Sequence, residues 1–346
     1  MSSQNIDPLA GFWYVAALSE ELDQHTVLSR RILDRALVLY RDNENRPVVA
    51  YDRCLHRCGK LSAGGKSANG RLVCPYHGWQ YGTQGRLELV PSEGGQEAAD
   101  ARNLKLETVA VQETEGLIYV CLNVSHQTPP PFSMPGWNDQ RIKRVRLVND
   151  FENSVTNCVE NFVDVPHTAT VHARIFRDAK GDAIIANVTA QNGVVSVDYA
   201  GERSNLGAFA WALNPRGLPV SHQDYFHAPN ITHVCYGIGK SRFLITSQCT
   251  PVRHGLTRVY TELAWDFGWL TPFAGPFVRR QAQAVIAQDQ AVLKDQWQVI
   301  NERPGGFLES PADVIHRYIH EIRAAVETGQ DLASLPTQRT EIRFLV

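Results

Sequence analysis

The chain has 346 residues, of which 43% are hydrophobic and 20% are charged, and its formal net charge is −2 at pH 7. This length and composition suit a globular protein that buries a large core and divides into two domains. The near-neutral charge excludes a nucleic-acid-binding protein of the usual basic kind, and the absence of any run of about eighteen apolar residues excludes a membrane-spanning helix.

The N-terminal residues, Met1 to Pro8, are polar and lack the basic and apolar segments of a leader, so we expect a cytoplasmic protein. The seven cysteines are an odd number, and reduced thiols fit that compartment.

Residues 1–124 are expected to form an all-β domain. Short runs of β-branched and aromatic residues alternate there with Gly, Asn and Asp turns, which is typical of strands. The expected strands are Leu33–Tyr40, Pro47–Tyr51, Leu72–Tyr81, Leu104–Gln112 and Leu117–Leu122. Residues 125–136 follow, with three consecutive prolines, and predict a stiff linker.

Two pairs of Cys and His lie within this β-domain. Cys54 and His56 form the first pair, and Cys74 and His77 form the second after seventeen intervening residues. Either pair alone is more often a chance match or part of a zinc site. Together, two thiolates and two imidazoles are the ligands of a Rieske [2Fe–2S] cluster, which has a higher potential than an all-cysteine cluster. The sequence therefore predicts that cofactor.

The stretch around the two pairs is basic. It contains six Lys or Arg and no Asp or Glu between Arg53 and Arg86. Such a basic rim either balances the charge of a reduced cluster or attracts an acidic redox partner, and both interpretations stay open.

Residues 137–346 predict a second domain, in which an antiparallel sheet is flanked by helices, so that the whole chain belongs to the α+β class. The expected strands are Val145–Phe151, Ile184–Tyr199, Thr232–Ile238, Phe243–Thr250 and Thr257–Trp265, and the expected helices are Pro276–Ile300 and Pro311–Val326.

A second motif lies early in this domain, with Asp164, His167 and His172 in one short segment. Residues five apart on a regular α-helix differ in direction by about 140° and cannot both face one metal ion. We therefore expect a broken or π-bulged turn at Pro166 if both histidines bind a metal. Asp164 and His167, three residues apart, would share a face. The alternative is a pair of surface histidines near the start of a helix.

Together the two motifs resemble those of Rieske non-haem iron oxygenases, in particular the oxygenase (alpha) components of the group that includes vanillate O-demethylase and dicamba monooxygenase. The resemblance extends over nearly the whole chain. It implies a mononuclear Fe(2+) held by His167, His172 and a downstream carboxylate, for which Asp289 is the candidate and Asp295 the alternative. The family usually has Glu directly before that Asp, whereas Gln288 stands here.

The resemblance also implies a reaction. Electrons from NAD(P)H would pass through a separate reductase and/or ferredoxin to the cluster, and O2 would then hydroxylate or oxidatively demethylate a small aromatic substrate. The alternatives are ring cis-dihydroxylation and a pure electron carrier, which would leave the residues after the linker without a purpose.

The family resemblance further implies a head-to-tail homotrimer, in which Asp164 bridges His77 of one subunit and His167 of the next. The alternative for Asp164 is a helix cap. For the substrate we expect polar contacts from Asn230 and His233 on a strand that lines the pocket, although a buried Asn or His more often satisfies backbone groups.

Overall fold

The structure is a computed structural model that describes residues 7–66, 69–126, 128–172, 183–200 and 218–345. The chain forms two compact units, Met1–Ser133 and Met134–Val346, and the boundary falls inside the stretch for which we expect a linker. Within the described ranges, every helix is too short or too polar to cross a membrane. Residues 1–6, which make up most of the polar N-terminal stretch considered above, lie outside those ranges.

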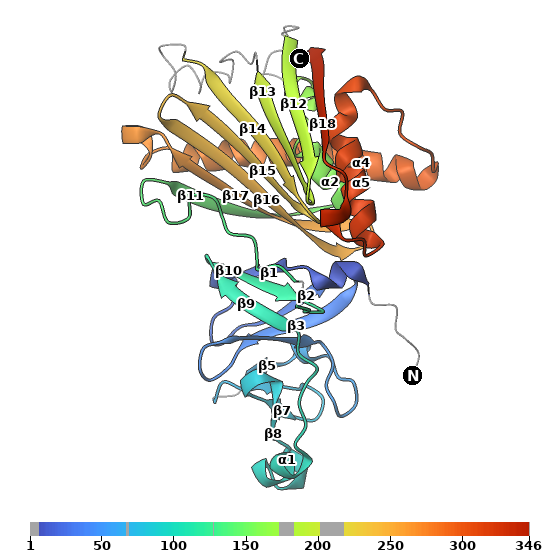
Figure 1. The fold of residues 1–346 in the computed structure, drawn as a ribbon. Coiled ribbons are helices and arrows are strands. Elements are labelled where there is room, and N and C mark those ends of the chain that lie inside the picture. The colour runs from blue at the N-terminus through green and yellow to red at the C-terminus, as the bar shows by residue number, and fades with distance from the viewer. Residues whose placement is uncertain (1–6, 67–68, 127, 173–182, 201–217, 346) are drawn as a thin grey trace. The chain divides into compact units, whose positions relative to one another are not determined.

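The first unit contains three small antiparallel sheets and the short α-helix α1, drawn in blue through cyan to blue-green (Figure 1). The sheets have the strand orders β1-β10-β9, β2-β3-β4 and β5-β6-β7-β8. The elements are β1 Tyr14–Leu18, β2 Val27–Ile32, β3 Arg35–Arg41, β4 Pro47–Tyr51, β5 Gly65–Lys66, β6 Leu72–Val73, β7 Gln80–Tyr81, β8 Leu87–Leu89, α1 Gln96–Arg102, β9 Ala110–Thr114 and β10 Leu117–Cys121.

Several strands of this unit differ from the expectation. The predicted strand Leu72–Tyr81 is two short strands with a loop between them, and the predicted Leu104–Gln112 becomes a strand only at Ala110. The sequence analysis missed β1 because all five of its residues are buried, which removes the alternation that reveals a half-buried strand. It missed β2 because Ser29, Arg30 and Arg31 lie in the middle of that strand.

The second unit is built on one eight-stranded antiparallel sheet with the order β11-β17-β16-β15-β14-β13-β12-β18 (Figure 1). Its strands are β11 Lys143–Phe151, β12 Ala183–Gln191, β13 Val194–Ala200, β14 Val220–His227, β15 Ile231–Ile238, β16 Ser241–Arg253, β17 Leu256–Asp266 and β18 Gln338–Leu345. The expected run Ile184–Tyr199 is a hairpin whose turn residues Asn192 and Gly193 both have positive φ, as a two-residue hairpin turn requires.

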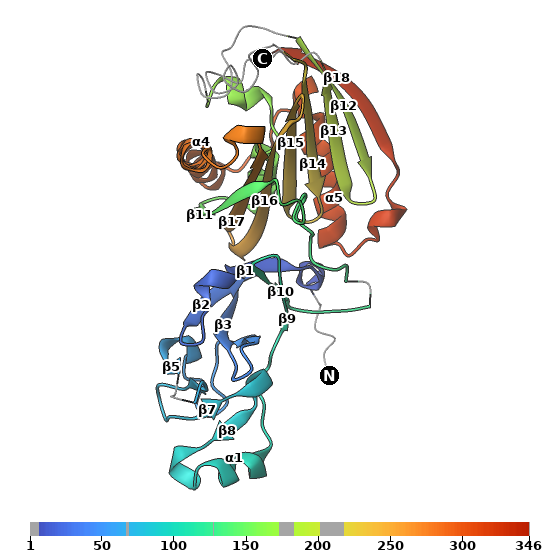
Figure 2. The same ribbon diagram turned by 90° about the vertical axis from the view of Figure 1, so that its left-hand side faces the viewer.

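Three helices pack on one face of this sheet, as Figure 2 shows from the side. They are α2 Val155–Asn161, α4 Gly275–Glu302 and α5 Val314–Glu327. Ile315, Ile319 and Ile322 of α5 are buried against the side chains of β12 and β13, as residues spaced four and three apart on one side of a helix would be. This is the predicted antiparallel sheet flanked by helices.

A buried asparagine holds two of these helices together. The Asn153 side-chain amide donates hydrogen bonds to the Leu293 carbonyl (2.7 Å) and to Gln296 Oε1 (2.9 Å) on α4. Its Oδ1 accepts from the Ser154 backbone N–H and the Asn157 side chain at the start of α2. The segment that follows α2 is therefore held against the middle of α4.

Candidate metal centres

The two loops that carry the first pair of motifs have the same backbone geometry. Cys54 N–H donates to the Gly59 carbonyl (2.9 Å), and Cys74 N–H donates to the Trp79 carbonyl (2.8 Å). In each loop the cysteine carbonyl also accepts a hydrogen bond from the N–H four residues later. Two matching loops therefore present one thiol and one imidazole each.

The four side chains separate by burial in the way a Rieske cluster requires. Cys54 and Cys74 are 1% and 2% exposed, whereas His56 and His77 are exposed, with their ring centroids 4.4 Å apart. A Cβ atom added to Gly59 would lie 3.1 Å from Cys74 Sγ, so only glycine lets this loop approach the thiols so closely. The donor set, two buried thiols and two surface imidazoles, fits a Rieske cluster.

Two aromatic residues near these ligands were not predicted. Tyr81 Oη lies 3.1 Å from Cys54 Sγ and accepts a hydrogen bond from Leu55 N–H (3.2 Å). The Trp79 ring stacks on His56 with centroids 4.8 Å apart. Both residues follow His77 closely in the sequence, and their position next to a predicted ligand is the signal by which they could have been found.

The basic rim is smaller than its composition indicates. Arg71 forms an ion pair with Glu88 (2.7 Å), and Lys66 donates to a backbone carbonyl, so these two side chains are engaged within the unit. Arg57 and Lys60 are exposed on the first loop.

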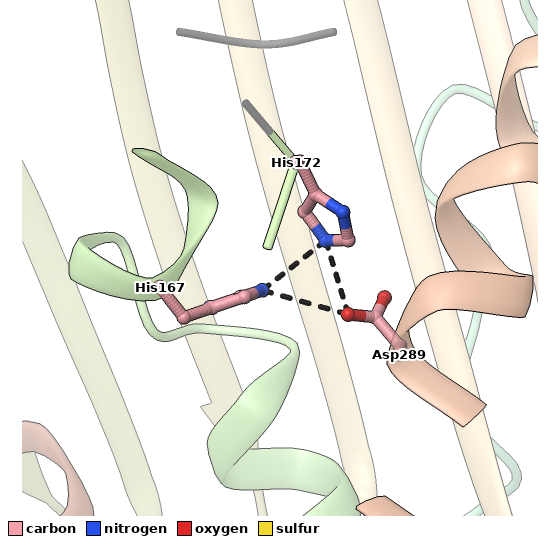
Figure 3. A group of neighbouring side chains, drawn as sticks. All are labelled: His167, His172 and Asp289. Carbon is pink, nitrogen blue, oxygen red and sulfur yellow. Dashed lines mark hydrogen bonds and ion pairs between the residues drawn. The ribbon is translucent and has the colours of Figure 1, made fainter. Parts of the chain in front are cut away.

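Three side chains of the second unit converge on one point (Figure 3). His167 lies on the short 3₁₀ helix Pro166–Ala169, His172 follows it, and Asp289 comes from α4. His167 Nε2 is 3.3 Å from His172 Nε2 and 3.6 Å from Asp289 Oδ1, and His172 Nε2 is 3.0 Å from the same oxygen. Donor atoms that share one ion at bond lengths of about 2.1 Å and right angles lie about 3.0 Å apart, so this spacing fits a metal ion.

The 3₁₀ helix explains how histidines five apart face one point. The backbone N–H groups of Thr170 and Val171 both donate to the His167 carbonyl (3.0 and 2.8 Å), which closes a tight turn. The expected broken or π-bulged turn is therefore present in its broken form, as a short 3₁₀ helix and not as a π-bulge.

The geometry of α4 decides which of the two candidate carboxylates, Asp289 or Asp295, reaches the histidines. Asp289 is 6% exposed and belongs to the group, whereas Asp295 is exposed and lies outside it. Six residues rotate by about 600° on an α-helix, so the two side chains point to different sides. Asp289 sits in the middle of α4.

Each histidine has a polar side chain near its second ring nitrogen. His172 Nδ1 lies 2.8 Å from Gln288 Oε1, which can only accept, so Nδ1 carries the proton and Nε2 keeps a lone pair for a metal. Asp164 Oδ2 lies 3.4 Å from His167 Nδ1 and so shares its face as expected. The replacement of the usual Glu by Gln288 therefore leaves the acceptor in place but removes its charge.

The electrostatics of the group favour a cation. Asp289 Oδ1 is buried and has no hydrogen-bond donor among the described residues. Burial lowers the pKa of His167, but contacts with Asp164 and Asp289 outweigh it and raise that pKa to about 9. A buried carboxylate oxygen is costly unless a cation or donor compensates it. Two imidazoles and one carboxylate fit ferrous iron.

The group lines a cavity of about 220 Å³ between the sheet and α4. Val234, Ile245 and Leu263 form part of its apolar wall and are register partners on the neighbouring strands β15, β16 and β17. The cavity therefore offers an apolar space next to the three converging side chains.

Comparison with known proteins identifies both halves of the chain. Residues 12–110 match the Rieske [2Fe–2S] domain, and residues 151–316 match the vanillate O-demethylase oxygenase C-terminal domain. Methylxanthine N1-demethylase NdmA of Pseudomonas putida is 34% identical over 342 residues, which cover 93% of this chain and 91% of that protein. The chain belongs to the Rieske oxygenase family.

Two further matches of this oxygenase-family chain concern its fold and its length. The crystal structure of dicamba monooxygenase bound to 3,6-dichlorosalicylic acid has a TM-score of 0.78, with 23% identity, and covers 92% of this chain and 98% of that one. It shows the common fold. The chloroplast protein TIC 55 of Arabidopsis thaliana is 31% identical over 230 residues, which cover 63% of this chain but only 39% of that protein. The chain thus spans well under half of this chloroplast relative.

The expected substrate contacts of this oxygenase-family chain lie elsewhere. Neither Asn230 nor His233 lines the cavity. The Asn230 side chain donates to the Cys249 carbonyl (2.7 Å), and His233 Nδ1 lies 2.9 Å from Thr246 Oγ1. His233 is adjacent to Val234 on β15 and so points to the opposite face of the sheet. The structure therefore favours the alternative, buried polar groups that satisfy their neighbours.

Proposed function

We propose that this chain is the terminal oxygenase component of a Rieske system that hydroxylates, and thereby demethylates, small aromatic molecules. The observation that carries the proposal is the convergence of His167, His172 and Asp289 at the wall of an apolar cavity. The Rieske domain in the same chain supplies the second half of such a system.

A ferrous ion held by two histidines and one carboxylate keeps positions open for dioxygen and for substrate. The residues of this chain prepare that site. Gln288 keeps the proton of His172 on Nδ1, and the Asp164 carboxylate, 3.4 Å from His167 Nδ1, favours a proton on that nitrogen, so that both Nε2 atoms would face the ion. The apolar wall formed by Val234, Ile245 and Leu263 holds a flat, uncharged ring and excludes water.

Demethylation is the reaction that the relatives support. NdmA is named for N1-demethylation of methylxanthines, and this chain aligns with 91% of it. Hydroxylation of an N-methyl or O-methyl carbon gives a hemiaminal or hemiacetal that releases formaldehyde. One oxygen atom from O2 therefore enters the methyl carbon, and two electrons and two protons reduce the other to water.

The electrons come from NAD(P)H through a separate reductase and/or ferredoxin. The exposed imidazoles of His56 and His77 support this route, because they bring the edge of the cluster site to the surface of the unit. Arg57 and Lys60 are exposed on the same loop and favour an acidic partner.

Electron transfer between subunits of a homotrimer completes the proposal. Asp164 would bridge His77 of one subunit and His167 of the next. Its side chain is 22% exposed while one carboxylate oxygen lies 3.4 Å from His167 Nδ1, so an accessible oxygen remains for a second imidazole.

The test is oxygen uptake and formaldehyde release by the iron-replete protein with NADH, a generic reductase, and a panel of methoxylated and N-methylated aromatic compounds. We expect both signals with at least one compound. Asp289→Ala should lose iron and both signals but keep the visible spectrum of the cluster, and Asp295→Ala on the same helix should keep everything. Oxygen uptake that yields a cis-diol without formaldehyde, or iron loss in Asp295→Ala alone, would contradict the proposal.

A further inference from the structure

A buried pair of ionisable side chains lies in the wall of the cavity. His222 and Asp224 are each 2% exposed, and both line the cavity. His222 Nε2 lies 2.9 Å from Asp224 Oδ1. Because an ionised carboxylate can only accept, His222 donates from Nε2. Neither the metal group nor the proposed electron route uses this pair.

The sheet fixes the orientation of the pair. His222 and Asp224 are two residues apart on β14 and therefore point to the same face. His222 is stacked between Tyr199 and Tyr236, its register partners on β13 and β15, with ring centroids 4.4 and 4.2 Å apart. The two tyrosines fix the plane of the imidazole, and the hydrogen bond to Asp224 fixes which ring nitrogen faces the carboxylate.

Asp224 keeps unused capacity to accept hydrogen bonds. A carboxylate has about four lone-pair sites, and His222 fills one of those of Asp224. The buried Tyr199 hydroxyl is close to Asp224, since burial and then Asp224 raise its pKa, and it can fill at most one more. A buried carboxylate with unfilled acceptor sites is costly, so it favours a ligand that donates.

The other charges around the cavity oppose an anionic ligand. Asp164 and Asp289 line the same cavity as Asp224. Arg242 is the single Lys or Arg among the described lining residues, and it forms an ion pair with Asp139 at 3.3 Å. A substrate carboxylate near Asp224 would place two negative charges in an apolar space.

We infer that Asp224, oriented by His222, is the substrate-recognising acceptor of this cavity, and that the substrate is an uncharged aromatic compound with an N–H or O–H group on its ring. This inference rests on the proposed function, because it takes the cavity beside the metal group as the substrate site. Substrate recognition would then depend on a residue of β14, whereas the iron would be held by residues of α4 and of the segment after α2.

The first test compares ligands on the unmodified holoprotein under anaerobic conditions by calorimetry. Theobromine carries a ring N–H where caffeine carries an N-methyl group, and 4-methoxyphenol carries an O–H where 1,4-dimethoxybenzene carries a second O-methyl group. We expect the donor in at least one pair to bind about tenfold more tightly than its methylated partner, and dicamba, a carboxylate, to bind more weakly than that donor. If no donor is preferred in either pair, or if the carboxylate binds best, the inference is overturned.

The second test changes the acceptor without changing its size. In Asp224→Asn the amide oxygen is needed by His222, so the amide NH2 group faces the cavity and an acceptor becomes a donor. We expect the preferred donor ligand to bind about tenfold more weakly, with its methylated partner unchanged within about twofold. Asp198→Asn is the matched control, because Asp198 is an exposed residue of β13 that pairs with Gln223 and lies on the other face.

The outcomes separate this inference from the proposed function. Loss of the donor preference in Asp224→Asn supports the inference even if no compound is demethylated, because the readout is affinity and not turnover. A preference that survives in Asp224→Asn overturns it even if demethylation is found. The comparison on the unmodified protein involves no substitution and decides the matter if Asp224→Asn fails to fold.

Discussion

The protonation of single ring nitrogens decides what the metal group can bind. His172 donates from Nδ1 to Gln288, so its Nε2 carries a lone pair that can bind an ion, and His167 lies between two carboxylates. Gln288 is uncharged, so it orients His172 without adding a negative charge beside Asp289. The hydrogen-bond acceptor for His172 and a negative charge beside Asp289 can therefore be tested separately by substitutions of Gln288.

Gln288→Leu should weaken ferrous ion binding about 10- to 100-fold, because the His172 proton is then free to move to Nε2. Gln288→Glu should retain tight binding, since a carboxylate also accepts from Nδ1. The measurement is an anaerobic titration of iron-depleted protein, with the visible spectrum of the cluster as a check of folding. Gln283→Leu, an exposed residue of the same helix, is the control. Wild-type affinity in Gln288→Leu would exclude this role.

Metal binding should depend on pH through His167. Its pKa, lowered by burial but raised more strongly by Asp164 and Asp289, is about 9 without the ion, against an ordinary value of 6.5. Protonation of His167 therefore stabilises the folded, iron-depleted protein. This contribution is fully present below pH 6.5 and is lost as the pH rises through about 9. An ion requires the neutral imidazole, so binding at pH 7.5 should release about one proton. Calorimetry in two buffers of different ionisation enthalpy measures this number, and His167→Ala should release less. No proton release would contradict the assignment.

At the scale of elements, the metal group depends on how two segments are held together. His167 and His172 follow α2, whereas Asp289 lies on α4, and Asn153 joins the two through hydrogen bonds to Leu293 and Gln296. Asn153 is fully buried, so water does not replace its hydrogen bonds. Its loss would therefore affect both folding and the spacing of the ligands.

Asn153→Ala should lower the free energy of unfolding by about 2 kcal/mol, because several buried groups lose their partner. It should also weaken iron binding, although no ligand is changed. Chemical denaturation of the iron-depleted protein gives the first quantity and an iron titration the second. Asn301→Ala removes a hydrogen bond to the Trp297 carbonyl at an exposed position of the same helix and should change both quantities little. Equal effects of the two variants would show that Asn153 has no special role.

At the scale of the whole molecule, the proposal requires cooperation between subunits. Cys54→Ser subunits lack the cluster, and His167→Ala subunits lack the iron, so neither should turn over by itself. If electrons pass only between subunits, mixed trimers should regain part of the activity. Mixed trimers verified by native mass measurement that remain inactive would argue against this route.

The sequence by itself determined the features that depend on neighbours along the chain. The two Cys and His pairs lie close together in the sequence, and their combined pattern alone indicated metal ligands. The spacing of His167 and His172 left surface histidines as an alternative, and the family resemblance was needed to interpret them as iron ligands. The α+β class and the long helix α4 also followed from local patterns, because alternation and helical periodicity are properties of single elements. Family resemblance was needed to propose Asp289 as a ligand, since it lies far from His167 and His172 in the sequence.

Only the tertiary structure decided which side chains from distant segments share one space. It placed Asn230 and His233 outside the cavity and brought Gln288 to His172. It also revealed β14, which was not predicted because Ser221, His222, Gln223 and Asp224 give it a polar sequence. A polar residue on a strand is buried or exposed according to what packs against that face, and this depends on strands and helices far away in the chain. For that reason the sequence did not predict that His222 and Asp224 form a pair that faces the cavity.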